Sequence, residues 1–260
     1  MPFDTLQLDK RGGLAVITLN RPQVLNALNR ATLDELAAAV EECSADDVLR
    51  VVLLTGAGPK AFVAGADIGE LAKLNEEEGA EYAALGQALL RRIETLGKPV
   101  IACVNGFALG GGCELAMACT VRLASETARL GQPEVKLGVI AGFGGTQRLA
   151  RLVGRGAALK LLLTGAVIPA AEALRIGLVD EVVPAGELMA RGEALAGEMA
   201  ANAPIALRLT LEAVDRGLDL PLDEGLGVEA RLFGEICATE DKAEGTQAFL
   251  GKRPAKWVGR

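Results

Sequence analysis

Apolar residues along the first half of the chain follow two different periods, and glycine or proline stands at most of the joins. The segments LQLDK and LAVITLN flank Gly12 and Gly13, a pattern typical of two strands joined by a tight turn. Three later runs are short and almost wholly apolar, which is typical of strands buried on both faces: RVVLLTG, PVIACVNG and VRLAS. This half of the chain therefore predicts a sheet with a buried centre.

Helical patterns separate these strands and dominate the second half. Thr32, with Glu35 three residues later, predicts a capping box at the start of one helix. Residues 76–97 predict another helix, and residues 146–250 are mostly helical apart from the strand-like run LVDEVVP. The whole pattern predicts an α/β body followed by a helical C-terminal region.

Residues 100–119 have nearly the length and apolarity of a membrane span. Asn105, Glu114 and four glycines between positions 106 and 112 interrupt that segment. A buried strand, a glycine turn and a buried helix explain these interruptions better than a membrane helix. We therefore expect no membrane partner.

Composition narrows the possible functions. Of the 260 residues, 50% are hydrophobic, enough for one large domain or for one domain with a smaller appendage. The net charge is -7, and acidic and basic residues are mixed along the chain, which argues against nucleic acid as the main partner. The first residues lack the pattern of a secretion signal or a transit peptide, so the sequence predicts a cytoplasmic protein.

The chain contains no histidine. This absence removes Ser-His and Cys-His nucleophile schemes and all histidine-ligated metal sites, and it leaves carboxylates as the first candidates for acid-base chemistry. The five cysteines form no CxxC pair, so we expect free thiols that serve as small core residues.

The segment NGFALGGGCELAMAC predicts a strand that passes into a helix through three consecutive glycines. Free N–H groups at such a helix start favour negative charge and can stabilise an oxyanion, although a lone Gly-Gly-Gly is more often a packing joint. Glu114 lies in the first turn of this apolar helix. Complementing the helix dipole and a functional role are equally good interpretations of Glu114 from this segment alone.

Two further segments contain candidates. Glu134 follows Pro133 in RLGQPEVKLGVIAGFGGTQRL, and taken alone it is typical of a solvated loop residue. In GPKAFVAGADIGEL, Asp67 is a candidate helix N-cap. The functional interpretation of the same segment is that the N–H of Ala66 points at the oxygen approached by the glycine run.

Together these segments resemble the crotonase, or enoyl-CoA hydratase/isomerase, family. The resemblance runs almost from end to end and rests on these motifs: LNRPQVLNALN, AFVAGADI, NGFALGGGCELAMAC, GQPEVKLGVIAGFGGTQRL, LTGAVIPAAEALRIGLVDEVV and EGTQAFLGKRP. It implies an α/β fold made of a spiral of ββα units. Residues 1–198 would form the spiral core, and residues 199–260 a helical region that packs trimers, commonly paired into hexamers.

The resemblance implies a site in which Ala66 and Gly111 donate backbone N–H groups to a thioester carbonyl, with Glu114 and Glu134 as the catalytic carboxylates. Both glutamates are present, which points to hydration of a 2-enoyl-CoA. Glu114 would activate the water that attacks C3, and Glu134 would deliver a proton to C2. Coenzyme A would then be part of the substrate, and no cofactor or metal would be needed.

Further substrate contacts are implied by position. The residue after GADI is often Lys in hydratases but is Gly69 here, which puts part of the contact with the nucleotide in doubt. Phe233 and Lys252 match positions that reach the coenzyme A of a neighbouring subunit. The full set of implied substrate contacts is Ala27, Leu28, Asp67, Ile68, Gly69, Phe233 and Lys252.

Two alternatives remain open at this point. One is a 3,2-enoyl-CoA isomerase, or another acyl-CoA enzyme of the same family, in which one glutamate moves the proton. The other is an RNA-associated binding protein of the same fold, against which the acidic charge and the lack of a basic stripe argue.

Overall fold

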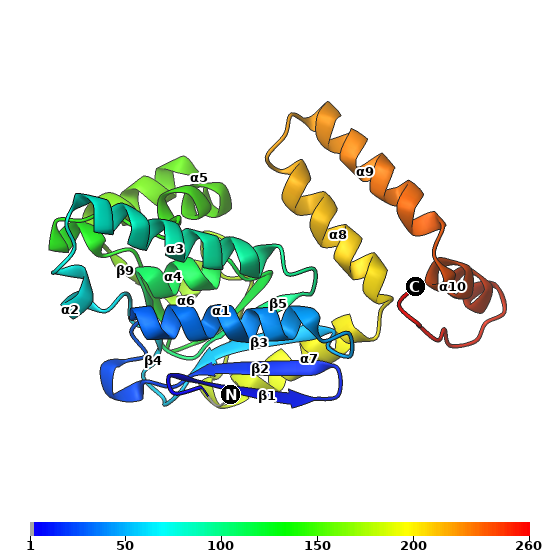
Figure 1. Cartoon of the computed structure of the whole chain (residues 1–260), viewed down its shortest axis with the longest axis horizontal. Coiled ribbons are helices and arrows are strands. Elements are labelled where there is room, and N and C mark those ends of the chain that lie inside the picture. The colour runs from blue at the N-terminus through cyan, green and yellow to red at the C-terminus, as the bar shows by residue number, and fades with distance from the viewer. Residues whose placement is uncertain (1–2) are drawn as a thin grey trace.

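A mixed sheet of six strands forms the centre of the computed structural model, which describes residues 3–260 (Figure 1). Its strands lie in the order β1 (Leu6–Arg11), β2 (Leu14–Leu19), β3 (Val51–Gly56), β5 (Val100–Val104), β7 (Val121–Ser125) and β10 (Glu181–Val183). Strands β1 and β2 are antiparallel and the other neighbours are parallel. The predicted hairpin and buried strands are confirmed.

Side chains alternate across this sheet, so each central strand is buried on both faces. Val52 and Leu54 face α1 (Arg30–Ala45) and α3 (Glu76–Glu94), which lie together on one face (Figure 1). Val51 and Leu53 point the other way, toward α7 (Leu188–Ala200). Burying each such aliphatic side chain stabilises the folded state by about 1.5–3 kcal/mol. These continuous apolar runs therefore stabilise the centre of the fold.

A second, smaller sheet contains β4 (Ala61–Val63), β6 (Phe107–Leu109), β8 (Arg129–Gly131) and β9 (Val167–Pro169), in that order. Strands β4, β6 and β8 are parallel to one another, and each follows shortly after β3, β5 or β7 of the large sheet. The chain therefore climbs through repeated pairs of strands, each followed by a helical segment. This is the predicted spiral of ββα units.

The remaining helical elements connect these units. The α-helices are α2 (Ile68–Leu71), α4 (Gly111–Met117), α5 (Gly145–Thr164) and α6 (Ala170–Arg175), and the 3-10 turns are η1 (Pro22–Val24), η2 (Glu134–Leu137) and η3 (Ala185–Glu187). Residues 100–119 contain the predicted buried strand, β5, and the predicted buried helix, α4, and the joint between them also contains the short strand β6. Within residues 3–260, no helix combines the length and apolarity required to cross a membrane.

Two details of the predicted elements are wrong. Helix α1 begins one turn earlier than expected: Asn29 is its N-cap and accepts the backbone N–H of Thr32 at 2.9 Å. Glu35 instead accepts the Thr5 backbone N–H at 2.8 Å and the Thr5 hydroxyl at 2.7 Å. Asn is as good a cap as Thr, and the tertiary contact with Thr5 takes the glutamate away from the helix start. Strand β9 was not predicted, because it has only three residues.

The chain ends in three helices, α8 (Pro204–Gly217), α9 (Leu222–Cys237) and α10 (Glu240–Leu250). Helices α8 and α9 form an antiparallel pair that projects from the body (Figure 1). The predicted boundary between residues 198 and 199 lies in the last turn of α7. Large apolar side chains remain exposed on this region: Val214, Leu218, Leu222, Leu226, Phe233, Phe249 and Leu250.

All five cysteines are free thiols, as expected. Cys43, Cys103, Cys113 and Cys119 are buried, which fits their predicted role as core residues. Cys237 is exposed at the end of α9, so this expectation is wrong there. The cause is that α9 projects from the body (Figure 1), so Cys237, at the end of this helix, lies outside the core.

Candidate active site

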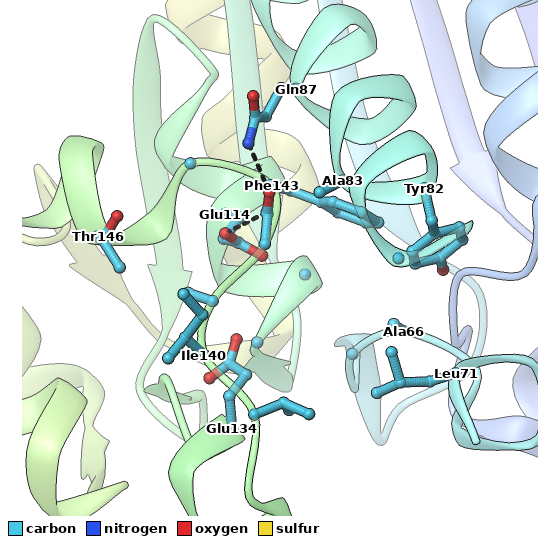
Figure 2. A pocket seen from close by; sticks show the side chains of 18 of the residues that line it. Ala66, Leu71, Tyr82, Ala83, Gln87, Glu114, Glu134, Ile140, Phe143 and Thr146 are labelled. Carbon is cyan, nitrogen blue, oxygen red and sulfur yellow. Dashed lines mark hydrogen bonds between the residues drawn. The ribbon is translucent and has the colours of Figure 1, made fainter. Parts of the chain in front are cut away.

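The carboxyl ends of β4, β6 and β8 bring three distant segments of the chain together. Ala66 follows β4, Gly111 follows β6 and Glu134 follows β8. Because the three strands are parallel neighbours, their ends lie at one edge of the small sheet. A cavity of about 1130 Å³ opens at this edge, and Figure 2 shows Glu114 and Glu134 lining it together with Ala66.

Two backbone N–H groups at this edge are free to bind a ligand. Among the hydrogen bonds formed within residues 3–260, none uses the N–H of Ala66 or of Gly111. Gly111 is the first residue of α4, where N–H groups have no partner within the helix. Ala66 is held in place by a parallel β-bridge to Leu28. Both N–H groups belong to residues that line the cavity, as an oxyanion hole requires.

Gly110 shapes the turn between β6 and α4. Its backbone has φ 50° and ψ −124°, a conformation that residues with side chains rarely adopt. A Cβ atom at this position would lie 3.0 Å from Oε1 of Glu134. Glycine thus allows the turn and leaves space for the carboxylate beside it.

Glu114 is buried in the first turn of α4, with 2% of its surface exposed. Its Oε1 accepts the backbone N–H groups of Phe143 at 2.8 Å and Gly145 at 2.6 Å. Burial raises the pKa of Glu114 from its usual 4.5 to about 7, and the neighbouring Glu134 acts in the same direction. The two N–H groups and Arg148 oppose this rise. A pKa in this range suits acid-base chemistry near neutral pH.

This raised pKa predicts how stability depends on pH. Between pH 4.5 and about 7 the unfolded chain has lost the Glu114 proton and the folded chain retains it. The free energy of unfolding therefore falls as pH rises through this interval, by about 3 kcal/mol. In Glu114→Gln this part of the slope is expected to disappear. Urea unfolding of both proteins across the interval, at one protein concentration, measures it, and equal slopes would contradict the prediction.

Glu134 lies in η2 and is half-buried against the cavity, so it is not the solvated loop residue that its own segment suggests. Burial raises its pKa. The buried side chain of Gln132, with its amide orientation assigned from its neighbours, donates to both carboxylate oxygens, at 2.6 and 3.1 Å. Gln132 is not among the predicted site residues, and its position two residues before Glu134 was the only available signal.

Tyr82 and Phe143 also line the cavity, although neither is among the predicted site residues. The centroids of their rings are 5.2 Å apart, and the Tyr82 hydroxyl lies 3.4 Å from the Leu28 carbonyl oxygen. Burial raises the pKa of Tyr82 to about 12, so the phenol stays neutral. These rings give the cavity an apolar wall beside the two carboxylates (Figure 2).

The other predicted contacts are distributed more widely. Ile68 lines the cavity. Asp67 is the N-cap of α2 and accepts the N–H of Gly69 at 3.0 Å, which confirms its interpretation as a cap. The remaining predicted contacts do not line this cavity: Ala27, Leu28, Asp67, Gly69, Phe233 and Lys252. Phe233 is 68% exposed on α9, and its predicted contact with a neighbouring subunit stays a prediction.

The arrangement combines free N–H donors with two carboxylates of raised pKa. Donors of this kind stabilise negative charge that develops on a carbonyl oxygen, and the carboxylates can hold a water molecule and move protons. Within the part of the chain that the structure describes, no cluster of three His, Cys, Asp or Glu side chains is placed to hold a metal ion.

The chain is similar to known proteins over almost its whole length. The family model for enoyl-CoA hydratase/isomerase matches residues 9–260. A short-chain-enoyl-CoA hydratase of Clostridium acetobutylicum is 51% identical over 253 residues, covering 97% of each chain. A crotonyl-CoA hydratase of Syntrophomonas wolfei is 48% identical over 260 residues, covering 100% of both.

A solved structure has the same fold. The crystal structure of an enoyl-CoA hydratase from Bacillus anthracis superposes with a TM-score of 0.95 at 42% identity, covering 99% of this chain and 100% of that one. Similarity of sequence and structure thus extends over almost the whole chain. The chain belongs to the enoyl-CoA hydratase/isomerase family.

Proposed function

We propose that this protein is an enoyl-CoA hydratase, a hydro-lyase that adds water across the 2,3 double bond of a 2-trans-enoyl-CoA to give a 3-hydroxyacyl-CoA. The observation that supports this most is the cavity that Glu114, Glu134, Ala66 and Gly111 line together. Relatives named as hydratases of enoyl-CoA and crotonyl-CoA support the same reaction.

In the proposed mechanism, the N–H groups of Ala66 and Gly111 bind the thioester oxygen. Negative charge builds on this oxygen as an enolate when water attacks, and binding it more tightly in that state lowers the barrier. Each such donor contributes roughly 2.7–4 kcal/mol. The two main-chain donors thereby set the position of the double bond relative to the carboxylates.

Glu114 and Glu134 carry out the proton transfers in this proposal. The Glu114 carboxylate, held by two N–H groups, orients the water and helps to remove its proton as the oxygen bonds to C3. Glu134 shares this water and delivers one proton to C2. One hydroxyl and one proton are added in total, so the carboxylate pair regains its initial protonation state.

We propose that coenzyme A takes part only as a portion of the substrate, and that no cofactor or metal is required. The carboxylates and N–H donors supply acid, base and oxyanion stabilisation without one. The names of the two relatives favour a short acyl chain, and the aromatic wall formed by Tyr82 and Phe143 offers an apolar surface for it. The substrate contacts at Asp67, Ile68 and Gly69 belong to this proposal.

A direct assay tests the reaction. The ultraviolet absorbance of crotonyl-CoA is expected to fall when the protein is added, with a chelator present and without nicotinamide. A Glu114→Gln/Glu134→Gln double variant is the control and is expected to leave the absorbance unchanged. An inactive wild-type protein would contradict the proposal, and rapid conversion of a 3-enoyl-CoA to the 2-enoyl isomer alone would indicate the isomerase.

We also propose that the chain forms trimers, alone or paired as hexamers, through the region that follows α7. The exposed apolar side chains on α8, α9 and α10 support this assembly, because such surfaces are typical of protein–protein contacts. Light scattering coupled to gel filtration measures the mass, for which 26.9 kDa is the monomer value. A cytoplasmic location stays a prediction.

A further inference from the structure

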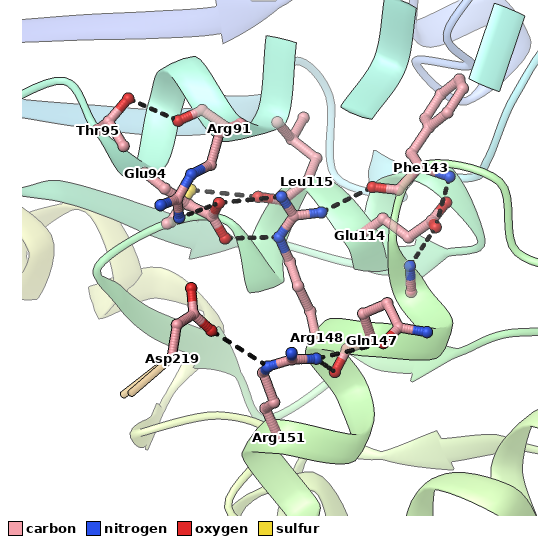
Figure 3. A network of polar contacts seen from close by, with 12 residues as sticks. Arg91, Glu94, Thr95, Glu114, Leu115, Phe143, Gln147, Arg148, Arg151 and Asp219 are labelled. Carbon is pink, nitrogen blue, oxygen red and sulfur yellow. Dashed lines mark hydrogen bonds and ion pairs between the residues drawn. The ribbon is translucent and has the colours of Figure 1, made fainter. Parts of the chain in front are cut away.

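A partly buried ion pair lies next to the loop that holds Glu114, residues 138–144. Arg148, in the first turn of α5, contacts Glu94 at the end of α3 through two bonds, Nε to Oε1 at 2.5 Å and Nη2 to Oε2 at 3.0 Å (Figure 3). The exposed fractions of the two side chains are 15% and 20%. Such a bidentate pair fixes the plane of the guanidinium group.

The third bond of this guanidinium reaches the loop. Nη1 of Arg148 donates to the carbonyl oxygen of Phe143 at 2.7 Å. The N–H of the same residue, Phe143, donates to Glu114, as does the N–H of Gly145. One residue of the loop is thus held by Arg148 on its carbonyl side and holds Glu114 on its amide side.

A second contact from α3 holds the preceding residue. Nε2 of Gln87 donates to the carbonyl oxygen of Gly142 at 2.8 Å. Gln87 and Glu94 are seven positions apart, which places them on the same face of the helix. Helix α3 therefore anchors the loop at Gly142 through Gln87, and at Phe143 through Glu94 and Arg148.

We propose that the Arg148–Glu94 pair is a positioning device for Glu114: it fixes the Phe143 peptide and thereby aims the carboxylate at the water. This inference rests on the proposed function. The pair acts on the rate of the chemical step, because a displacement of about 1 Å at a reacting group can lower a rate about 10²-fold. Lysine cannot replace Arg148 fully, since an ammonium group lacks the planar fork that engages both partners.

The charge of Arg148 gives the proposal a second readout. Two charged groups shift the pKa of Glu114: Glu134, from η2, raises it, and Arg148, from α5, lowers it. Removing the cation is expected to raise this pKa further. Removing the anionic partner in Glu94→Gln leaves the cation uncompensated and is expected to lower it.

The test compares Arg148→Gln, Arg148→Lys and Glu94→Gln with the wild-type protein. For Arg148→Gln we expect kcat for crotonyl-CoA to fall about 10-fold to 100-fold, with KM within about 2-fold of the wild-type value. The acidic limb of its pH profile moves to higher pH. Arg148→Lys restores the position of that limb but only part of kcat, and Glu94→Gln moves the limb to lower pH. Arg175→Gln, which breaks an exposed bidentate pair with Glu172, is the matched control and changes none of these.

A measurement without turnover separates this inference from the proposed function. Titration of the Glu114 carboxyl by ¹³C NMR, assigned by its loss in Glu114→Gln, reports the same shifts without substrate. If the wild-type protein does not hydrate crotonyl-CoA, the proposed function fails and this titration still decides the placement of Glu114. A folded Arg148→Gln with wild-type kcat and an unchanged titration overturns the inference. If Arg148→Gln does not fold, Glu94→Gln decides the matter. A pKa of Glu114 that does not fall in Glu94→Gln then overturns the inference.

Discussion

Replacing Glu134 with glutamine is expected to lower kcat for crotonyl-CoA hydration by about 10²–10⁴-fold, the usual contribution of a positioned acid or base. Glu114→Gln is expected to cause a loss of the same order. An amide keeps the size of the carboxyl group and still accepts hydrogen bonds, so Gln132 and the Phe143 N–H retain partners. What is lost is the ability to exchange a proton.

The expected pattern is specific to chemistry rather than to binding. KM is expected to change little in either variant, because Ala66 and Gly111 bind the thioester in the proposed mechanism. Steady-state rates with crotonyl-CoA measure both constants. Glu77→Gln, an exposed glutamate in the first turn of α3, is the control and retains wild-type kcat. Full activity in Glu114→Gln or in Glu134→Gln would rule out the two-carboxylate mechanism.

The second large effect is expected from Gly112→Ala, in the first turn of α4. A Cβ atom at Gly112 would lie 2.0 Å from the carbonyl oxygen of Val63 and 2.6 Å from the Val63 Cβ atom. Both atoms belong to the buried strand β4, so they cannot move aside without displacing the chain that leads to Ala66. Overpacking of this kind costs about 1–3 kcal/mol, and kcat is expected to fall with it.

Denaturant unfolding and crotonyl-CoA hydration of the same preparation measure the two effects. Gly197→Ala is the matched control, because Gly197 is an exposed glycine of α7 with no atom near the added methyl group. That control is expected to gain about 0.5–1 kcal/mol from the higher helix propensity of alanine. A Gly112→Ala protein with wild-type stability and activity would show that β4 and α4 do not approach as closely as described.

Much of the fold could be predicted because its signals are local. The hairpin around Gly12 and Gly13 and the apolar runs of β3, β5 and β7 depend on residues next to one another in the chain. Asn29 caps α1 locally, but two other errors arose where a distant partner decided the outcome. The Glu35 side chain accepts a hydrogen bond from Thr5 instead of capping α1, and β9 forms only because it pairs with β8. Short strands of this kind have no sequence signature of their own.

The candidate site shows the same division. The glycine run, Glu114 and Glu134 could be named from the chain because their types and order match a family motif. Gln132 and Arg148 could not, since a glutamine in a loop and an arginine in a helix are ordinary surface residues until their neighbours are known. Their partners, Glu134 and Glu94, become visible only in the assembled structure.

The sequence by itself determined which segments form buried strands, where glycine permits tight turns, and to which family the residues are similar. These properties depend on local periodicity and residue type. Only the tertiary structure decided that Ala66, Gly111 and Glu134 line one cavity, and that a loop around Phe143 holds Glu114. The physical reason is that these contacts depend on the parallel order of β4, β6 and β8, which long-range packing selects and no single segment encodes.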